Sequence, residues 1–235
     1  MSLFISSNIC YNTLVKQERR SMKIILENNE AEIVEKKSRF IANIAAVSSE
    51  EEAIEFIEKI KKKYYDARHN CYAYIIGDKG DKKKCSDDGE PQRSAGMPMM
   101  EVLENQGYFD IVAVVTRYFG GTLLGVGGLI RAYQGAVIEG LNASVSGEIH
   151  EGFRAKYRFG YDFYGKIKYI AESENIVIED TLFDETVTIS LIFNDSESER
   201  LQKKLVEETN ANIERLLLEK IKYITVDNKW YKEYR

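Results

Sequence analysis

The pattern of apolar and polar residues changes twice between residues 109 and 141. Ile111 to Val115 form a short apolar run rich in β-branched residues, which is typical of a buried central strand. Five glycines then fall between residues 120 and 128, and from Leu129 to Leu141 apolar residues recur at helical spacing. The pattern predicts a strand, a glycine-rich loop and a helix, in that order.

Shorter patterns precede this stretch. Residues 31–47 are rich in isoleucine, valine and phenylalanine around a charged centre, which predicts two short strands joined by a turn. Ser49 and Glu52 have the spacing of a capping box at the start of a helix. The polar residues 78–96 predict a long loop, and a short helix is expected over residues 98–106.

Strict alternation of apolar and polar residues begins at Phe153 and continues to Phe163. It predicts a half-buried strand with an inward aromatic face, which leaves Arg154, Lys156 and Arg158 on the outward face. Such a basic face could bind a phosphate backbone. Three alternating cations are also common on ordinary solvated strands, so both interpretations stay open.

The chain after this strand predicts a helix, two strands, a second helix and a last long strand. The second helix is expected to begin at a capping box formed by Ser196 and Glu199. The order βαββαβ is that of a ferredoxin-like domain. Because the aromatic signature of RNA-recognition modules is missing, any RNA contact on this sheet would go to phosphates rather than to bases.

The length of 235 residues predicts two domains. We expect a first domain over residues 22–147, a ferredoxin-like domain over 148–227 and a tail over 228–235, with the boundary near Gly147 to Glu151. Met22 resembles a natural start, so residues 1–21 are expected to be a non-native or disordered extension. The predicted class is α+β.

The net charge and the cysteine content limit the classes of function and the cellular location that fit this chain. The formal net charge of −5 argues against general nucleic-acid binding, so any anion site must be local. The three cysteines form no CxxC pair, which favours a reducing compartment, and we predict a cytoplasmic location. No apolar run approaches the ~20 residues of a membrane helix, so no membrane partner is expected.

The glycine-rich loop is the first candidate site. It lacks the Lys-Ser/Thr of a P-loop and the last glycine of a dinucleotide fingerprint. A glycine loop before a helix N-terminus can bind an anion, and arginines lie close to both ends. The glycines could equally serve only tight turning and close packing. The candidate anion or nucleic-acid site consists of Arg117, Gly120, Gly121, Gly125, Gly127, Gly128 and Arg131.

A second candidate polar site lies earlier in the chain. His69 and Cys71 are two apart at the start of a predicted strand and would share a face, as a nucleophile and its base would. Asp87, Asp88 and Glu90 could approach a hard cation, although a turn explains them more simply. We assign no catalytic residue, and we expect no metal and no cofactor.

Four motifs carry a resemblance to a known family. DARHNCYAY, DDGEP, SAGMPM and RYFGGTLLGVGGLIRAYQGA resemble the YigZ branch of the Impact protein family. The resemblance covers residues 22–145. It implies a first domain with a ribosomal protein S5 domain 2-like fold, followed by a domain resembling the last domain of elongation factor G. It also implies a link to regulation of translation, with an RNA or ribosome partner, and it brings no catalytic mechanism.

Two departures from the family pattern limit what the resemblance implies. Arg93 and Ser94 stand where the family usually has glycine and threonine, so the local turn could differ, and Arg93 could add a cation. Animal and fungal relatives carry an N-terminal module that engages the activator of a translation-inhibiting kinase. Residues 1–21 are too short to be that module, so this partner does not carry over.

The sequence leaves three functions open. The leading hypothesis is a non-catalytic, translation-related regulator that binds RNA or the ribosome through the glycine loop and the outward face of Arg154, Lys156 and Arg158. A regulator that binds a protein partner without nucleic acid is the first alternative. The second is an enzyme that uses His69 and Cys71 on a small anionic substrate.

Overall fold

A strand of buried residues organises the first half of the chain. The computed structural model describes residues 22–227 and 229–234. In it β6 (Ile111–Tyr118) is the middle strand of a five-stranded antiparallel sheet with the order β2-β3-β6-β4-β5. Its neighbours are β2 (Asn29–Glu35), β3 (Ser38–Ala46), β4 (His69–Ile76) and β5 (Lys82–Ser86). The predicted central strand and the predicted strand pair before it are confirmed.

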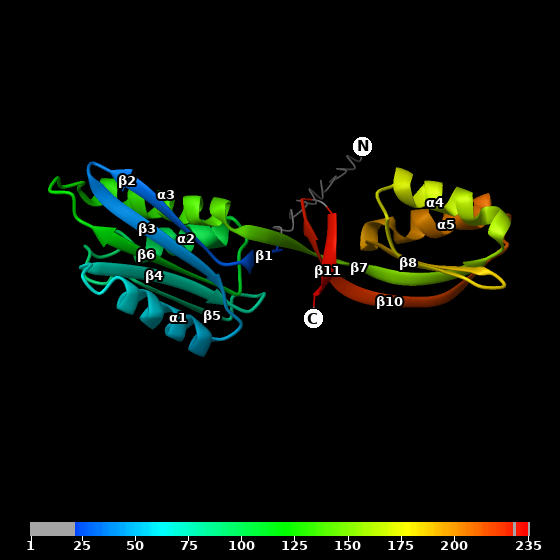
Figure 1. Cartoon of the computed structure of the whole chain (residues 1–235), viewed down its shortest axis with the longest axis horizontal. Helices are drawn as coiled ribbons and strands as arrows, with labels where there is room; N and C mark the ends of the chain where they lie inside the picture. The colour runs from blue at the N-terminus through cyan, green and yellow to red at the C-terminus, as the bar shows by residue number, and fades with distance from the viewer. Residues whose placement is uncertain (1–21, 228, 235) are drawn as a thin grey trace, which may run out of the picture.

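Helices cover both faces of this sheet (Figure 1). Val112 and Val114 of β6 pack toward α1 (Glu50–Lys63), whereas the alternate residues of β6 pack toward α2 (Gly96–Asn105) and α3 (Val126–Ala143). The start of α1 is fixed by Ser49, whose hydroxyl accepts the backbone N–H of Glu52. The period of two along β6 therefore supplies two hydrophobic cores, one on each face.

The second domain has the predicted order of elements. Its elements are β7 (Val145–Phe159), α4 (Tyr164–Ser173), β8 (Val177–Phe183), β9 (Val187–Asn194), α5 (Ser198–Glu208) and β10 (Ile213–Val226). The strand order is β10-β7-β9-β8, and both helices cover one face (Figure 1). Tyr157 and Phe159 are buried beneath these helices, as the alternation predicts. The two-domain α+β fold with a βαββαβ second half is confirmed.

One strand runs through both domains. The first residues of β7 pair with β1 (Met22–Glu27), its later residues pair with β9, and β10 follows it along nearly its whole length. β11 (Lys229–Tyr234) then pairs with the end of β10. The segment from Gly147 to Glu151 therefore lies inside β7 rather than in a loop. Residues 1–21 lie outside the described part of the chain.

Three local predictions are wrong. β5 lies within the predicted loop of residues 78–96, because its lysines face solvent on an edge strand and show no apolar alternation. The alternating strand ends at Phe159, and Tyr161–Phe163 form the 3-10 turn η1. The second capping box is made by Asn194 and not by Ser196; it precedes the 3-10 turn η2 (Asp195–Glu197).

Candidate nucleic-acid interface

Several loops meet at one edge of the first sheet. Because β6 is antiparallel to both β3 and β4, the end of β6 lies beside the starts of these two strands, and Arg117 faces Phe40 and His69. We call this edge the loop end. It comprises the β2–β3 turn (36–37), residues 87–93, the glycine-rich loop (119–125) and the start of α3. In Figure 1 it points away from the second domain.

The glycine-rich loop is anchored to the β2–β3 turn. The backbone N–H of Gly120 donates to Ser38 Oγ at 3.1 Å, and a Cβ at Gly120 would lie only 2.0 Å from the carbonyl carbon of Lys37. Gly125 has φ +72°, in the left-handed region that favours glycine, at the residue before α3. These glycines therefore have a structural role in addition to any role in binding.

Gly127, at the start of α3, is less constrained. A Cβ at Gly127 would meet only Arg131 Nη1, at 3.8 Å, so the Arg131 guanidinium lies near the helix N-terminus. Arg131 is exposed. The positive end of the helix dipole and this guanidinium thus lie together.

Arg117 does not offer a free charge to the loop. Arg117 Nη1 donates to Glu90 Oε1 at 2.6 Å, and the two side chains are only 7% and 3% exposed. The Tyr133 hydroxyl donates to the same Glu90 oxygen at 2.9 Å. Arg117 belongs to the predicted anion site by position, but its charge is neutralised by Glu90. This corrects the expectation that it serves as a free cation.

The acidic loop is held by its own backbone. The Asp87 carboxylate accepts the backbone N–H groups of Arg93, Ala95 and Gly96, at 2.7, 3.0 and 2.8 Å. The Asp88 carboxylate accepts the N–H of Asn70 at 2.7 Å. Among residues 22–227 and 229–234, no group of three or more His, Cys, Asp or Glu side chains is placed to hold a metal ion. The geometry agrees with the turn interpretation.

His69 and Cys71 share a face and contact that loop. His69 Nδ1 lies 2.8 Å from the Asp88 carbonyl oxygen. Cys71 Sγ lies 3.0 Å from the Asp87 carbonyl oxygen and 3.3 Å from the Tyr133 hydroxyl. Cys71 is fully buried, and this burial raises the pKa of its thiol. A buried, protonated thiol is a poor nucleophile, so the geometry does not support the enzyme hypothesis.

Exposed cations from four segments lie at the loop end. They are Lys36, Lys37, Arg68, Arg93 and Arg131. None of these side chains makes an ion pair or a hydrogen bond with any residue that the structure describes. Of these five residues, the sequence alone indicates only Arg131 and Arg93 as candidate cations of a binding site. Arg68 could have been found from its place immediately before His69 in the DARHNCYAY motif.

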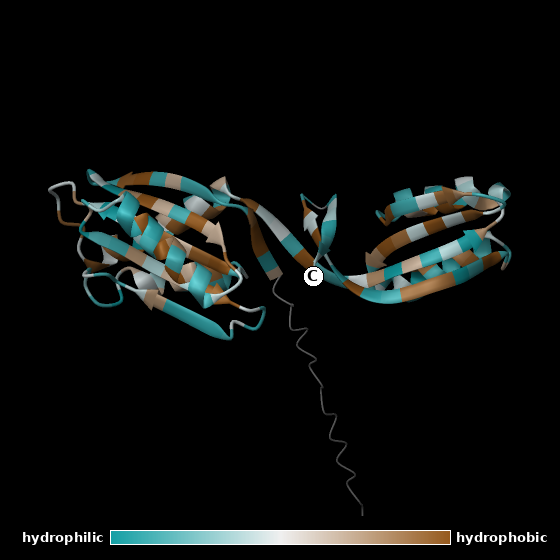
Figure 2. Ribbon diagram, turned by 60° about the horizontal axis from the view of Figure 1, so that its bottom comes forward, coloured by the Kyte–Doolittle hydropathy of each residue, from teal (hydrophilic) through white to brown (hydrophobic). Residues whose placement is uncertain are grey.

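The glycine-rich loop and the first residue of α3 also expose apolar side chains. Phe119 and Val126 are each 54% exposed and Leu123 is 83% exposed. In Figure 2 this loop lies at the far left, and part of it is brown, the colour of hydrophobic residues. Several exposed apolar residues at one edge of a domain are more typical of a binding surface than of a loop with a purely structural role.

The outward face of the second sheet is not a free basic face. The Arg154 guanidinium binds Glu179 through two hydrogen bonds, at 2.6 and 2.7 Å, and also binds Glu219 and Glu233. These hydrogen bonds, that to Glu179 foremost, raise the pKa of Arg154. Arg158 lies 3.5 Å from Glu214. Of the three predicted cations only Lys156 has no partner among the described residues, which corrects the expectation of a basic face.

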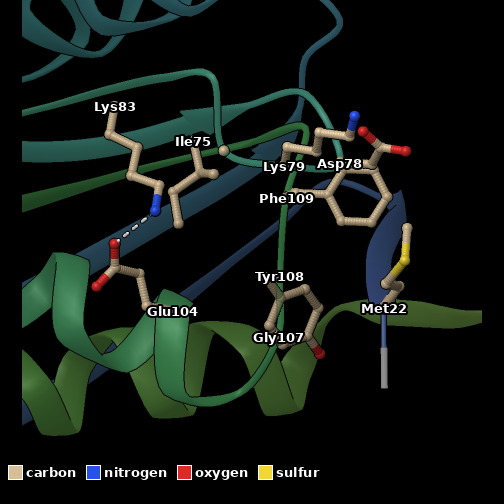
Figure 3. Close-up of a pocket in the computed structure, with 10 residues that line it drawn as sticks. Met22, Ile75, Asp78, Lys79, Lys83, Glu104, Gly107, Tyr108 and Phe109 are labelled. Carbon is tan, nitrogen blue, oxygen red and sulfur yellow. Dashed lines mark hydrogen bonds and ion pairs between the residues drawn. The ribbon is translucent and has the colours of Figure 1, made fainter. Parts of the chain in front are cut away.

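A pocket of about 320 Å³ lies at the opposite end of the first domain (Figure 3). Met22, Ile75 and Phe109 form part of its wall, and Lys83 binds Glu104 across it at 2.9 Å. None of the predicted site residues lines it.

In the part of the chain that the structure describes, no helix is long and apolar enough to cross a membrane.

Comparisons with known proteins agree with the fold. The family model described as the Impact N-terminal domain matches residues 36–141, and a domain of unknown function, DUF1949, matches residues 158–212. A solved structure titled as the crystal structure of a hypothetical protein is 30% identical, with a TM-score of 0.53. The match covers 85% of this chain and 98% of that chain.

Three bacterial relatives are similar to this chain in sequence. The IMPACT family member YvyE of Bacillus subtilis is 42% identical over 188 residues, which cover 80% of this chain and 86% of YvyE. An IMPACT family member of Haemophilus influenzae is 34% identical over 78% of this chain and 90% of its own length. YigZ of Escherichia coli is 46% identical over 45% of this chain and 53% of its own length. With most of its length aligned to such relatives, this chain belongs to the IMPACT family.

Proposed function

We propose that this chain is a non-catalytic, translation-related regulator that binds RNA through the loop end of its first domain. Membership of the IMPACT family supports the link to translation that the sequence motifs imply. The observation that carries the RNA proposal is the group of five exposed, unpaired cations around the glycine-rich loop, at Lys36, Lys37, Arg68, Arg93 and Arg131. A cytoplasmic location stays a prediction.

The charge distribution favours this edge. With a net charge of −5, the chain as a whole repels RNA, so binding requires a local cluster that acts within the Debye length of about 8 Å. At the loop end the nearby carboxylates of Asp87, Asp88 and Glu90 are already engaged with backbone N–H groups or with Arg117. Arg117 neutralises Glu90, and Lys61 lies 4.0 Å from Asp88. The Asp87 carboxylate keeps its negative charge, but the five cations of the cluster outnumber it.

The second sheet is a weaker candidate. Arg154 is surrounded by three glutamates, and Arg158 has Glu214 beside it. An incoming phosphate would have to compete with these carboxylates. We therefore assign RNA binding to the loop end and not to the outward face of the second sheet.

A charge-removal experiment tests this assignment. The double variant Lys37→Ala/Arg131→Ala is titrated against fluorescent RNA over a series of salt concentrations. The slope of log affinity against log salt is expected to fall by about one to two units, because two phosphate contacts are lost. The matched control is Lys156→Ala, an exposed and unpaired lysine of the second sheet. An unchanged slope in the double variant, or an equal change in the control, would contradict the assignment.

A protein partner is the second candidate function. The exposed Phe119, Leu123 and Val126 favour it, because apolar side chains at a loop tip can enter a groove on another protein. A partner captured from a lysate after nuclease treatment and at high salt, and lost on Leu123→Asp substitution, would support this function. RNA contacts weaken steeply with salt and would not survive those conditions.

A further inference from the structure

Phe119 lies between two immobilised residues. On one side, the guanidinium of Arg117 lies 5.7 Å from the centre of the Phe119 ring and is fixed by the buried ion pair with Glu90. On the other side, Gly120 is fixed against the β2–β3 turn by its hydrogen bond to Ser38 and by its close approach to Lys37. The Phe119 backbone therefore has little freedom, although its side chain is 54% exposed.

This arrangement resembles an aromatic platform that is held in position before a ligand binds. The same guanidinium lies 5.4 Å from the ring of Phe40, which is fully buried and contacts Tyr133 edge-on. The ring of Phe119 thus lies beside a fixed guanidinium, which in turn lies against the buried ring of Phe40. A ring that is held in place before binding loses little entropy when a second flat group stacks on it.

From this geometry we infer that Phe119 stacks on an unpaired base, so that the loop end selects single-stranded RNA. The inference rests on the proposed RNA-binding function. Bases stack on aromatic side chains only where they are not already stacked in a duplex. Lys37, beside Gly120, and Arg131, at the start of α3, lie where they can contact the phosphates that flank the stacked base. A duplex, whose bases are already stacked, would contact only these two cations and not the Phe119 ring.

The test uses a short unstructured RNA that carries the fluorescent base 2-aminopurine, with a duplex of the same length for comparison. Phe119→Ala is expected to weaken binding of the single strand about tenfold or more and to abolish quenching of the base. Phe119→Tyr and Phe119→Trp should retain both. Duplex binding should not change. Leu123→Ala is the matched control, since it removes an exposed apolar side chain from the same loop.

The outcomes separate this inference from the proposed function. Wild-type affinity and quenching in Phe119→Ala, with binding still sensitive to Lys37→Ala/Arg131→Ala, would overturn stacking and leave phosphate binding intact. An equal loss in Leu123→Ala would also overturn it, because the loss would then reflect apolar area. If the wild-type chain binds neither RNA at about 50 mM salt, the proposed function itself fails and the inference fails with it.

Discussion

At the scale of single residues, the loop end depends on a buried polar network. Glu90 accepts from both Arg117 and Tyr133, and Cys71 contacts Tyr133 from β4. The sequence indicates a special role for Arg117 but gives no sign of its partner. Glu90 lies 27 residues away, and only the register of β4, β6 and the acidic loop brings the two side chains together.

Replacement of Glu90 should destabilise the chain strongly. Glu90→Gln leaves the Arg117 charge buried without a counter-charge, so we expect the free energy of unfolding to fall by about 3 kcal/mol or more. Tyr133→Phe removes only one hydroxyl donor and should cost about 1 kcal/mol. Urea unfolding followed by circular dichroism measures both. Equal stabilities of Glu90→Gln and the wild type would show that the ion pair is not important for stability.

Cys71 should resist alkylation in the folded protein. Burial holds the pKa of its thiol above the ordinary value of about 8.5, so at pH 8 the thiol remains protonated as well as inaccessible. Mass spectrometry of the peptide that contains Cys71, after iodoacetamide treatment at pH 8, should find it unmodified until denaturant is added. Rapid modification of the native chain would revive the enzyme hypothesis.

At the scale of elements, the sequence predicts the helices and strands that have a clear apolar pattern and misses those that have none. β6, the glycine-rich loop and α3 follow from an apolar run, a glycine cluster and a helical period in succession. β1, β5 and β11 were missed because strands near a sheet edge need no apolar alternation. β1 pairs with β7, which is distant in the sequence, whereas β5 and β11 each pair with the strand that precedes them.

Two glycines of the same loop region should respond differently to alanine. Gly120→Ala places a Cβ against the Lys37 backbone, so it should detach the loop, destabilise the chain and weaken RNA binding. Gly127→Ala meets no close atom and replaces glycine within α3, so stability should stay the same or rise by about 0.5–1 kcal/mol. Thermal melting and the RNA titration measure both variants. Equal tolerance of the two would mean that the loop is not anchored at Gly120.

At the scale of the whole molecule, the sequence predicts two domains but not how they join. Strand β7 belongs to the second sheet, yet Ile149 on β7 and Ile224 on β10 contribute to the core of the first domain. Lys222 and Tyr234 also contact Asp78 and Asp110 of the first domain. Strict alternation begins only at Phe153, so the sequence gives no signal that the first residues of β7 form a strand with β1.

Hydrogen–deuterium exchange of the intact chain, with and without unstructured RNA at low salt, tests whether RNA binds at the loop end. We expect slower exchange in peptides that contain residues 36–37, 88–93 and 119–128, because bound RNA covers the loop end. Peptides from the strands of the second sheet should exchange at the same rate in both samples. Protection of the second sheet, with none at the loop end, would show that RNA does not bind at the loop end.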